Sequence, residues 1–314
     1  MLIMSPVARS FDLEGHRGAR GLAPENTLAA FATAMRIGIT TLELDTGMTK
    51  DGVLVISHDS FLNPDHTRSP DGNFLQARGP AIRALTLAEL KRYDVGRLKP
   101  GTSYAASFPE QEGMDGTTIP TLAELFELVR GADADHIRFN IETKLTPHSD
   151  AYTPDPDTFA AALASAVREA NLVARVSVQS FDWRTLLAMR RIAPEIERVC
   201  LTIDGGSADT LHRGEVSPWT AGFHIDAYDG SVPRLVGAAE CAVWSPRLHN
   251  LSPESFAQAK ALGLRVIPWT VNDRAQMQAL IALGVDGIIT DYPNRLRALM
   301  AENGMTLPPA VPVR

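Results

Sequence analysis

Short apolar runs and amphipathic helical segments alternate along the chain. Residues 11–16 and 41–45 alternate between apolar and polar side chains, and between them apolar residues repeat at helical spacing over 28–35. Asn26 is the expected N-cap of that helix, and Gly38 is expected to end it. A strand, a helix and a second strand in this order form the unit of a parallel sheet, so the pattern predicts an α/β protein.

Counted along the whole chain, the apolar runs predict eight strands, which lie near residues 12, 41, 137, 175, 197, 242, 265 and 287. Eight β/α units predict a (β/α)8 TIM barrel, a fold that takes about 250 residues. The runner-up is an open doubly wound sheet, which usually carries a glycine-rich phosphate loop that this sequence lacks. We therefore expect a single TIM-barrel domain over residues 1–314.

The segment 59–118 interrupts this rhythm and is rich in Pro, Gly, Ser and Asp. One helical piece stands out in it, 86–91, where Thr86 and Glu89 are expected to form a capping box. The segment holds too few apolar residues for a core of its own, so we expect a lid-like insertion after the second barrel strand. The Pro-rich tail 301–314 is expected to be irregular.

Composition narrows the class of protein further. The chain is 45% hydrophobic with a net charge of −7 and has no run of Lys and Arg, so we expect a globular protein that binds no nucleic acid. No apolar stretch approaches the ~18 residues of a membrane span, and residues 1–9 lack the apolar core of a signal peptide. A cytoplasmic protein is the default expectation, and a periplasmic or secreted one follows if a leader was removed.

Cys200 and Cys241 are expected to be two small buried residues rather than a disulfide framework or a metal motif.

Carboxylates gather on two of the predicted strands. Successive side chains of a strand point to opposite faces, so Glu43 and Asp45 share one face, as do Glu142 and Lys144 on a later strand. Paired carboxylates on a buried face need a cation, a basic side chain or a proton, whereas a solvated edge strand would need none. Three carboxylates form an all-oxygen site, which suits one divalent cation, Mg²⁺ or Ca²⁺, with Mn²⁺ also compatible.

Two histidines, His16 and His58, flank the acidic pair, and imidazole titrates near neutral pH, so they can act as general acid and base. Arg17 and Lys144 can hold phosphate oxygens. Trp269 can form an apolar wall for the alcohol part of a ligand, although a core aromatic is an equal alternative. Barrel enzymes place their chemistry at the C-terminal ends of the strands. The polar and aromatic residues that fall there are His16, Glu43, Asp45, Glu142, Gln179, Trp269, Thr290 and Asp291.

Several short stretches carry a family resemblance when they are taken as a set. They are His16-Arg17-Gly18, Pro24-Glu25-Asn26-Thr27, Glu43-Leu44-Asp45, Asp51-Gly52, His58-Asp59, Ile119-Pro120-Thr121-Leu122, Asn140-Ile141-Glu142-Thr143-Lys144, Trp269-Thr270-Val271-Asn272 and the closing stretch from Gly284 to Asp291. Together they resemble the signature of glycerophosphodiester phosphodiesterases. The resemblance implies a TIM barrel that hydrolyses glycerophosphodiesters to glycerol 3-phosphate and an alcohol with a divalent cation.

The resemblance also implies roles for particular positions. The metal ligands of the family match Glu43, Asp45 and Glu142, and its acid and base match His16 and His58. The phosphate-contacting positions match Arg17 and Lys144, so the implied partner is a small-molecule phosphodiester.

Two alternatives remain beside this function. One is phospholipase D-like hydrolysis of lysophospholipids, which share the glycerophosphodiester core; an exposed apolar patch near the mouth would favour it. The other is a catalytically silent metal-binding barrel, against which the intact set of site residues argues. The sequence leaves open the leaving alcohol, the native metal, the assignment of acid and base, the first nucleophile and the oligomeric state.

Overall fold

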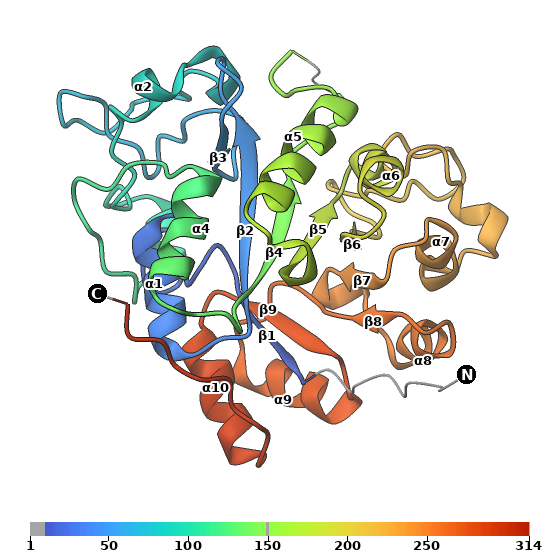
Figure 1. The fold of residues 1–314 in the computed structure, drawn as a ribbon. Coiled ribbons are helices and arrows are strands. Elements are labelled where there is room, and N and C mark those ends of the chain that lie inside the picture. The colour runs from blue at the N-terminus through green and yellow to red at the C-terminus, as the bar shows by residue number, and fades with distance from the viewer. Residues whose placement is uncertain (1–9, 149–150, 314) are drawn as a thin grey trace.

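The computed structural model describes residues 10–148 and 151–313, in which parallel strands form a barrel surrounded by helices (Figure 1). The barrel strands are β1 (Asp12–Gly15), β2 (Thr41–Met48), β4 (Arg138–Thr143), β5 (Val176–Ser180), β6 (Glu197–Thr202), β7 (Val243–Pro246), β8 (Arg265–Val266) and β9 (Gly287–Thr290). They pair in parallel in the order β8-β7-β6-β5-β4-β2-β1-β9. Backbone hydrogen bonds of 3.0 Å, from Asp286 N to Val266 O and from Ile289 N to Pro268 O, join the region of β8 to β9. The predicted (β/α)8 barrel is confirmed.

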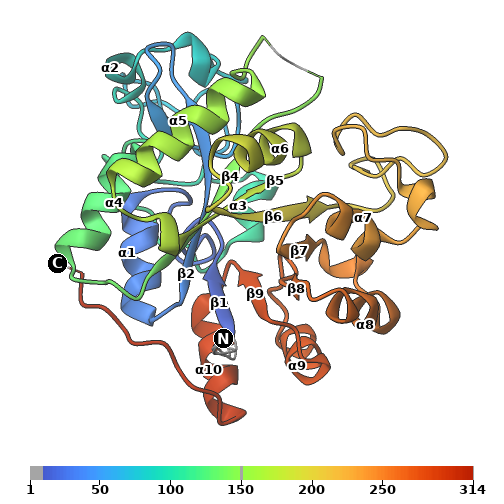
Figure 2. The ribbon, with the colours of Figure 1, turned by 45° about the vertical axis from the view of Figure 1, so that its right-hand side comes forward.

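Helices lie outside the strands in both Figure 1 and Figure 2. They are α1 (Leu28–Ile37), α4 (Leu122–Gly131), α5 (Pro156–Glu169), α6 (Trp183–Ile192), α7 (Val232–Ala238), α8 (Pro253–Ala261), α9 (Arg274–Leu283) and α10 (Pro293–Glu302). Their apolar stripes, such as Phe31 and Met35 of α1, are buried against the outward-facing side chains of the strands. Because successive residues of a strand alternate between the two faces, the other side chains of the strands point into the barrel. These inner side chains include polar ones such as Glu43 and Gln179 and an apolar cluster of Val199, Val243, Ile267 and Ile289.

The first helix begins one residue later than expected. Thr27 is its N-cap, with a hydroxyl that accepts from Ala30 N at 3.2 Å. Asn26 instead has a φ of 55°, and its Nδ2 donates to Asp45 Oδ2 at 2.9 Å. The prediction of Asn26 as the cap was wrong because asparagine suits a left-handed turn as well as a cap. The buried carboxylate of Asp45 selects the turn. Gly38 ends the helix at a φ of 90°, as predicted.

The insertion follows the end of β2 and lies at the upper left of Figure 1. It is preceded by β3 (Leu54–Ile56), which pairs antiparallel with β2, and it contains the short helices α2 (Leu87–Leu90) and α3 (Ser103–Ser107). The predicted capping box of Thr86 and Glu89 is present. Leu62, Ile82, Leu90 and Val95 of the insertion form a small hydrophobic cluster with Val55 and Ile119, which lie just outside 59–118. The apolar residues of the insertion are therefore buried together with residues that flank it.

Cys200 in β6 and Cys241, just before β7, form a disulfide. Their burial was predicted, but the expectation of two separate thiols was wrong. The strands β6 and β7 are neighbours in the sheet, which brings the two Cα atoms to 5.9 Å, within the range of a disulfide. A separation of 41 residues conceals this proximity in the sequence.

After α10 the chain runs back towards α1 and α4 (Figure 2). Residues 305–313 form neither helix nor strand, and Val311 N donates to Met35 O at 2.9 Å. Within the described ranges, every helix is too short or too polar to cross a membrane.

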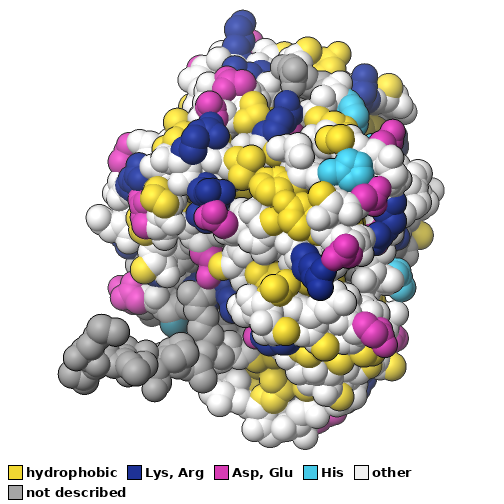
Figure 3. All heavy atoms as spheres, turned by 90° about the vertical axis from the view of Figure 1, so that its right-hand side faces the viewer, with side chains coloured by type: hydrophobic (Ala, Val, Ile, Leu, Met, Phe, Trp, Pro, Cys, Tyr) yellow, Lys and Arg dark blue, Asp and Glu magenta, His cyan; other side chains and the backbone are white. Residues whose placement is uncertain are grey.

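The side of the barrel that carries α6, α7 and α8 presents interspersed acidic, basic and apolar side chains (Figure 3). Many surface charges are paired, as Arg191 is with Asp157 and Arg234 with Asp229. Such exposed ion pairs contribute roughly 0–1 kcal/mol each, so the buried core rather than surface pairing stabilises the barrel.

Candidate active site

Three carboxylates converge at the mouth of the barrel, by which we mean the C-terminal ends of its strands. Glu43 and Asp45 belong to β2, and Glu142 lies opposite Asp45 on the neighbouring β4. All three are buried, and one oxygen from each lies within 4.8 Å of the other two. The alternating pattern of the strands therefore placed these side chains on one face as expected. Three carboxylates at this spacing form a donor set that fits a divalent cation of the Mg²⁺ or Ca²⁺ type.

Two basic side chains lie beside this cluster. Lys144 Nζ is 2.9 Å from Glu142 Oε1 and 3.6 Å from Asp45 Oδ1. Arg17 Nε is 3.2 Å from Asp45 Oδ2. Burial would raise the pKa of Asp45, but these two cations and His58 lower it well below its usual range. Asp45 is therefore the carboxylate that the basic side chains keep ionised.

The other two carboxylates are less well compensated. Burial and the adjacent Asp45 raise the pKa of Glu43 well above its usual range. Burial raises the pKa of Glu142 to about 7, against the opposing effect of Lys144. The cluster thus holds more carboxylate than its basic neighbours neutralise, which is the electrostatic condition that favours a bound cation.

His16 follows β1 and lies deep in the mouth. Its Nδ1 is 2.6 Å from Asp291 Oδ1, and its Nε2 is 3.9 Å from Glu43 Oε2. Burial, together with Arg20, lowers the pKa of His16 to about 4, so the ring is neutral at pH 7. The carboxylate of Asp291 accepts the Nδ1 proton, which leaves Nε2 as a proton acceptor.

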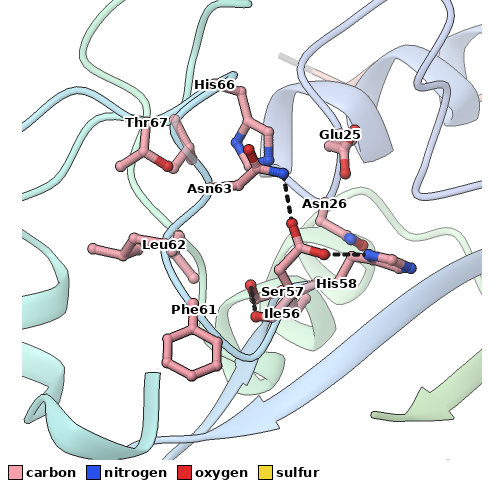
Figure 4. A pocket seen from close by; sticks show the side chains of 13 residues that line it. Glu25, Asn26, Ile56, Ser57, His58, Phe61, Leu62, Asn63, His66 and Thr67 are labelled. Atoms are coloured by element: carbon pink, nitrogen blue, oxygen red, sulfur yellow. Dashed lines mark hydrogen bonds and ion pairs between the residues drawn. The ribbon is translucent and has the colours of Figure 1, made fainter. Parts of the chain in front are cut away.

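His58 follows β3 and repeats this arrangement. Its Nδ1 is 2.8 Å from Asp59 Oδ1, and Asp59 Oδ2 accepts from Asn63 Nδ2 at 2.7 Å (Figure 4). Burial, followed by Arg17 and Lys144, lowers the pKa of His58. The side chain of His58 is 34% exposed and that of His16 is 11% exposed, so His58 is the nearer of the two to solvent.

Gln179 of β5 orients one of the carboxylates, a role that sequence reasoning did not assign to it. Its Nε2 donates to Glu43 Oε1 at 2.7 Å, and its Oε1 accepts from Asn140 Nδ2 at 3.0 Å. Asn140 also donates to Glu14 Oε2 at 2.9 Å, so polar contacts continue inward through the barrel. The signal in the sequence was the position of Gln179 at a strand end, but only the structure identifies its partners.

Arg20 was not predicted from the sequence, and it contacts the carboxylate that holds His16. It makes a bidentate contact with Asp291, in which Nε donates to Oδ1 at 2.8 Å and Nη2 donates to Oδ2 at 3.1 Å. Arg17 is held in a similar way, because its Nη1 donates to Glu25 Oε1 at 2.6 Å. Burial would raise the pKa of Glu25, but Arg17 lowers it to about 2. In the sequence, the available indication of Arg20 was its position three residues after Arg17.

A cavity of about 160 Å³ connects these groups. Its polar side is formed by His16, Arg17, Arg20, Glu43, Asp45, His58, Glu142, Lys144 and Gln179, so all of the predicted acidic, basic and histidine residues meet here. The apolar side includes Trp269 and Phe181, whose rings meet edge to face at 5.3 Å between centroids. Trp269 Nε1 donates to Ser245 O at 2.9 Å, which fixes the indole as a wall of the cavity. Phe181 was not anticipated.

A second, smaller cavity lies beside the first and is shown in Figure 4. Glu25, Asn26 and His58 line it from the barrel side, and Leu62 and His66 line it from the insertion. The insertion therefore packs directly against residues of the site.

Comparison with known proteins identifies the family. The profile of the glycerophosphoryl diester phosphodiesterase family matches residues 16–295. A glycerophosphodiester phosphodiesterase of Caldanaerobacter subterraneus subsp. tengcongensis is 32% identical over 293 residues, covering 92% of this chain and 97% of that protein. One from Bacillus altitudinis is 30% identical over 283 residues, covering 89% and 94%.

A solved structure agrees with these sequence matches. The crystal structure of a Silicibacter pomeroyi protein, assigned to the glycerophosphoryl diester phosphodiesterases, has a TM-score of 0.84 and 32% identity and covers 95% of each chain. The chain therefore belongs to the glycerophosphoryl diester phosphodiesterase family and is an enzyme of the phosphoric diester hydrolase class.

Proposed function

We propose that this protein hydrolyses glycerophosphodiesters to glycerol 3-phosphate and an alcohol, with one divalent cation and a pair of histidines. The observation that carries the proposal is the convergence of a three-carboxylate donor set and two carboxylate-bound histidines on one cavity. A phosphodiesterase of Oleispira antarctica, which shares the fold at a TM-score of 0.65 and 24% identity, was solved with the product sn-glycerol-3-phosphate.

Glu43, Asp45 and Glu142 would hold the cation, with Mg²⁺ or Ca²⁺ as the expected ion and Mn²⁺ also compatible, because all three ligands are hard oxygens. When bound, the cation would polarise a phosphoryl oxygen and neutralise charge on the diester. Arg17 and Lys144 border the same cavity and would bind the remaining phosphate oxygens.

The two histidines would move the protons. Asp291 and Asp59 hold the Nδ1 atoms of His16 and His58, which leaves both Nε2 atoms available to the ligand. One Nε2 accepts the proton of the attacking hydroxyl as the new P–O bond forms. The other, in its imidazolium form, donates a proton to the leaving alkoxide oxygen as the old P–O bond breaks, so protons and charge balance.

Hydrolysis of lysophospholipids is the second candidate substrate class. Human lysophospholipase D GDPD1 is 25% identical over 295 residues. Tyr152, which is 43% exposed, follows β4, and its ring contacts that of Phe61 in the insertion at 4.7 Å between centroids and a tilt of 58°. This aromatic pair is an apolar surface near the mouth on which an acyl chain would rest.

A substrate panel separates the candidates. The protein is treated with EDTA and then assayed with glycerophosphocholine, glycerophosphoethanolamine and lysophosphatidylcholine after addition of Mg²⁺, Ca²⁺ or Mn²⁺, and the released alcohol is measured. We expect metal-restored hydrolysis of the water-soluble diesters. Preference for lysophosphatidylcholine would establish the second candidate, and calorimetric binding of glycerophosphocholine without turnover would instead establish a silent barrel.

The proposed compartment is an oxidising one, such as the periplasm or the cell exterior. The Cys200–Cys241 disulfide supports it against the cytoplasmic default, because cytosolic proteins rarely keep disulfides. Thiol alkylation of the protein in its native host, followed by mass spectrometry, would contradict this if both cysteines were found reduced.

A further inference from the structure

Several side chains of the insertion contact the active site, and Tyr104 is the one that hydrogen-bonds to Glu25. This residue belongs to α3, and its hydroxyl donates to Glu25 Oε2. Arg20 Nη1 donates to the same hydroxyl at 3.5 Å. The Tyr104 ring rests edge to face on Phe108, with 5.3 Å between the centroids, so its position is fixed by packing as well as by polar contacts.

Glu25 connects this tyrosine to Arg17. One carboxylate oxygen of Glu25, Oε1, accepts from Arg17 Nη1 at 2.6 Å, and the other, Oε2, accepts from Tyr104. The side chains of Arg17 and Glu25 are 9% and 7% exposed, so solvent does not readily replace a lost contact. A buried hydrogen bond to a charged group has a larger effect when it is removed than an exposed one does.

The Tyr104 hydroxyl also bears on the electrostatic repulsion between two arginines of the site. Arg17 and Arg20 repel one another, and each is held by its own carboxylate, Glu25 for Arg17 and Asp291 for Arg20. Glu25 attracts both arginines. The Tyr104 hydroxyl donates to Oε2 of Glu25 and accepts from Arg20, while Oε1 of Glu25 accepts from Arg17.

We infer that Tyr104 is a positioning residue, which acts through Glu25 to fix the guanidinium of Arg17 where the phosphodiester binds, and so makes the insertion part of the active site. This inference rests on the proposed function, because it takes Arg17 as a phosphate-binding residue. The inference gives the insertion a role in substrate binding rather than in proton transfer. Among the described residues, Tyr104 makes no hydrogen bond to His16 or His58.

The decisive variant is Tyr104→Phe, which removes one oxygen and keeps the ring on Phe108. We expect KM for glycerophosphocholine to rise by about tenfold, and the Kd for glycerol 3-phosphate to rise by the same factor. The value of kcat should change by less than about twofold, because the histidines and their carboxylates are untouched. Tyr93→Phe is the matched control, because Tyr93 lies in the same insertion and packs on its hydrophobic cluster away from Glu25.

A double-mutant cycle distinguishes positioning from a general effect on the fold. In an Arg17→Lys background, Tyr104→Phe should no longer raise KM, because the fork of hydrogen bonds that Tyr104 supports is already lost. An equal rise in both backgrounds, or no rise in either, would overturn the inference. If Tyr104→Phe does not fold, Glu25→Gln, which weakens the same link, is expected to raise KM similarly, and an unchanged KM would also overturn it.

The proposed function is checked separately in the same series. If the wild type hydrolyses none of the diesters, the proposed function fails, and the role of Tyr104 is then decided by calorimetry with glycerol 3-phosphate alone. Weaker binding by Tyr104→Phe than by the wild type supports the inference. Equal binding, or no binding to the wild type, contradicts it.

Discussion

The two ends of the barrel both bury charged side chains, but they arrange them differently. At the bottom, by which we mean the N-terminal ends of the strands, two arginines lie between two carboxylates. Arg138 is 3.7 Å from Asp12 and 3.6 Å from Glu197, and Arg265 contacts the same two acids. The hydroxyls of Thr40 and Thr41 also donate to Asp12 Oδ1, so each bottom carboxylate faces several donors.

At the mouth, by contrast, like charges are brought together. The three carboxylates of Glu43, Asp45 and Glu142 meet at one point, and Lys144 and Arg17 stand to the side. Where acidic and basic side chains alternate, each charge is neutralised by its neighbours. Where like charges converge, their repulsion destabilises the folded state unless a cation binds between them. In the described part of the chain, only the mouth cluster has the geometry of a metal site. The arrangement of charge, rather than its amount, therefore distinguishes a functional end from a structural one.

The largest expected difference between the two ends concerns metal. Chelation should abolish hydrolysis, and Glu43→Gln should lower kcat by on the order of a thousandfold, because the proposed cation would lose a ligand. Glu197→Gln, the equivalent change at the bottom, should lower the melting temperature and leave kcat within about twofold. Kinetics with each metal and thermal unfolding measure both. A large loss of kcat in Glu197→Gln would remove the proposed distinction.

A second prediction concerns the carboxylate behind His16. Asp291→Asn should lower kcat by about a hundredfold, because an amide does not hold the Nδ1–H tautomer as a carboxylate does. Asp135, whose side chain is 98% exposed, supplies the control variant Asp135→Asn. Wild-type kcat in Asp291→Asn would show that His16 needs no such orientation.

Gln179 offers a smaller test, because it touches the mouth cluster without being a ligand. Gln179→Leu removes the donor to Glu43 Oε1 and should weaken metal affinity by about tenfold. Metal titration of the apoprotein by calorimetry gives the affinity directly. Unchanged affinity would mean that β2 and the backbone N–H of Arg17, which donates to Glu43 Oε2 at 2.8 Å, orient Glu43 without Gln179.

The smallest effect on activity is expected from Glu14, between the two ends. Burial and the nearby Asp12 raise its pKa from 4.5 to about 8. A carboxyl whose pKa is raised in the folded state stabilises the fold fully below the unfolded pKa, and that stabilisation is lost as pH rises through the folded value. Urea unfolding of the metal-saturated wild type should therefore show stability falling between about pH 5 and pH 8 from this group. Glu14→Gln cannot ionise, so its profile should be flatter, with kcat unchanged, and equal slopes would refute the assignment.

Strand periodicity was sufficient to predict the barrel and the meeting of Glu43, Asp45 and Glu142. The side-chain period of a strand is two and the mouth of a barrel gathers strand ends, so residues nearly a hundred positions apart could be placed together. The partners of the two histidines differ in this respect. Asp59 adjoins His58 in the sequence, whereas Asp291 reaches His16 only because β9 pairs with β1.

The remaining features depend on contacts that no local pattern encodes. Tyr104 meets Glu25 because the insertion, which carries it on the short helix α3, folds back over the barrel. Asn26 was misassigned because its side chain can either cap the helix or bind a distant partner. In the structure it donates to the buried carboxylate of Asp45 instead of capping the helix. Turns and loops carry such contacts, and their paths follow from packing rather than from periodicity.

The disulfide of Cys200 and Cys241 bears on how the protein is produced. It closes a loop of 41 residues within the outer core, and neither cysteine lines the cavity at the mouth. Cross-linking a loop of that length lowers the entropy of the unfolded chain by an amount equivalent to about 4 kcal/mol. Material made in a reducing host would lack that margin, whereas the side chains that line the cavity would be chemically unchanged. Yield and storage life, rather than turnover, should then depend on whether an oxidant is supplied during folding.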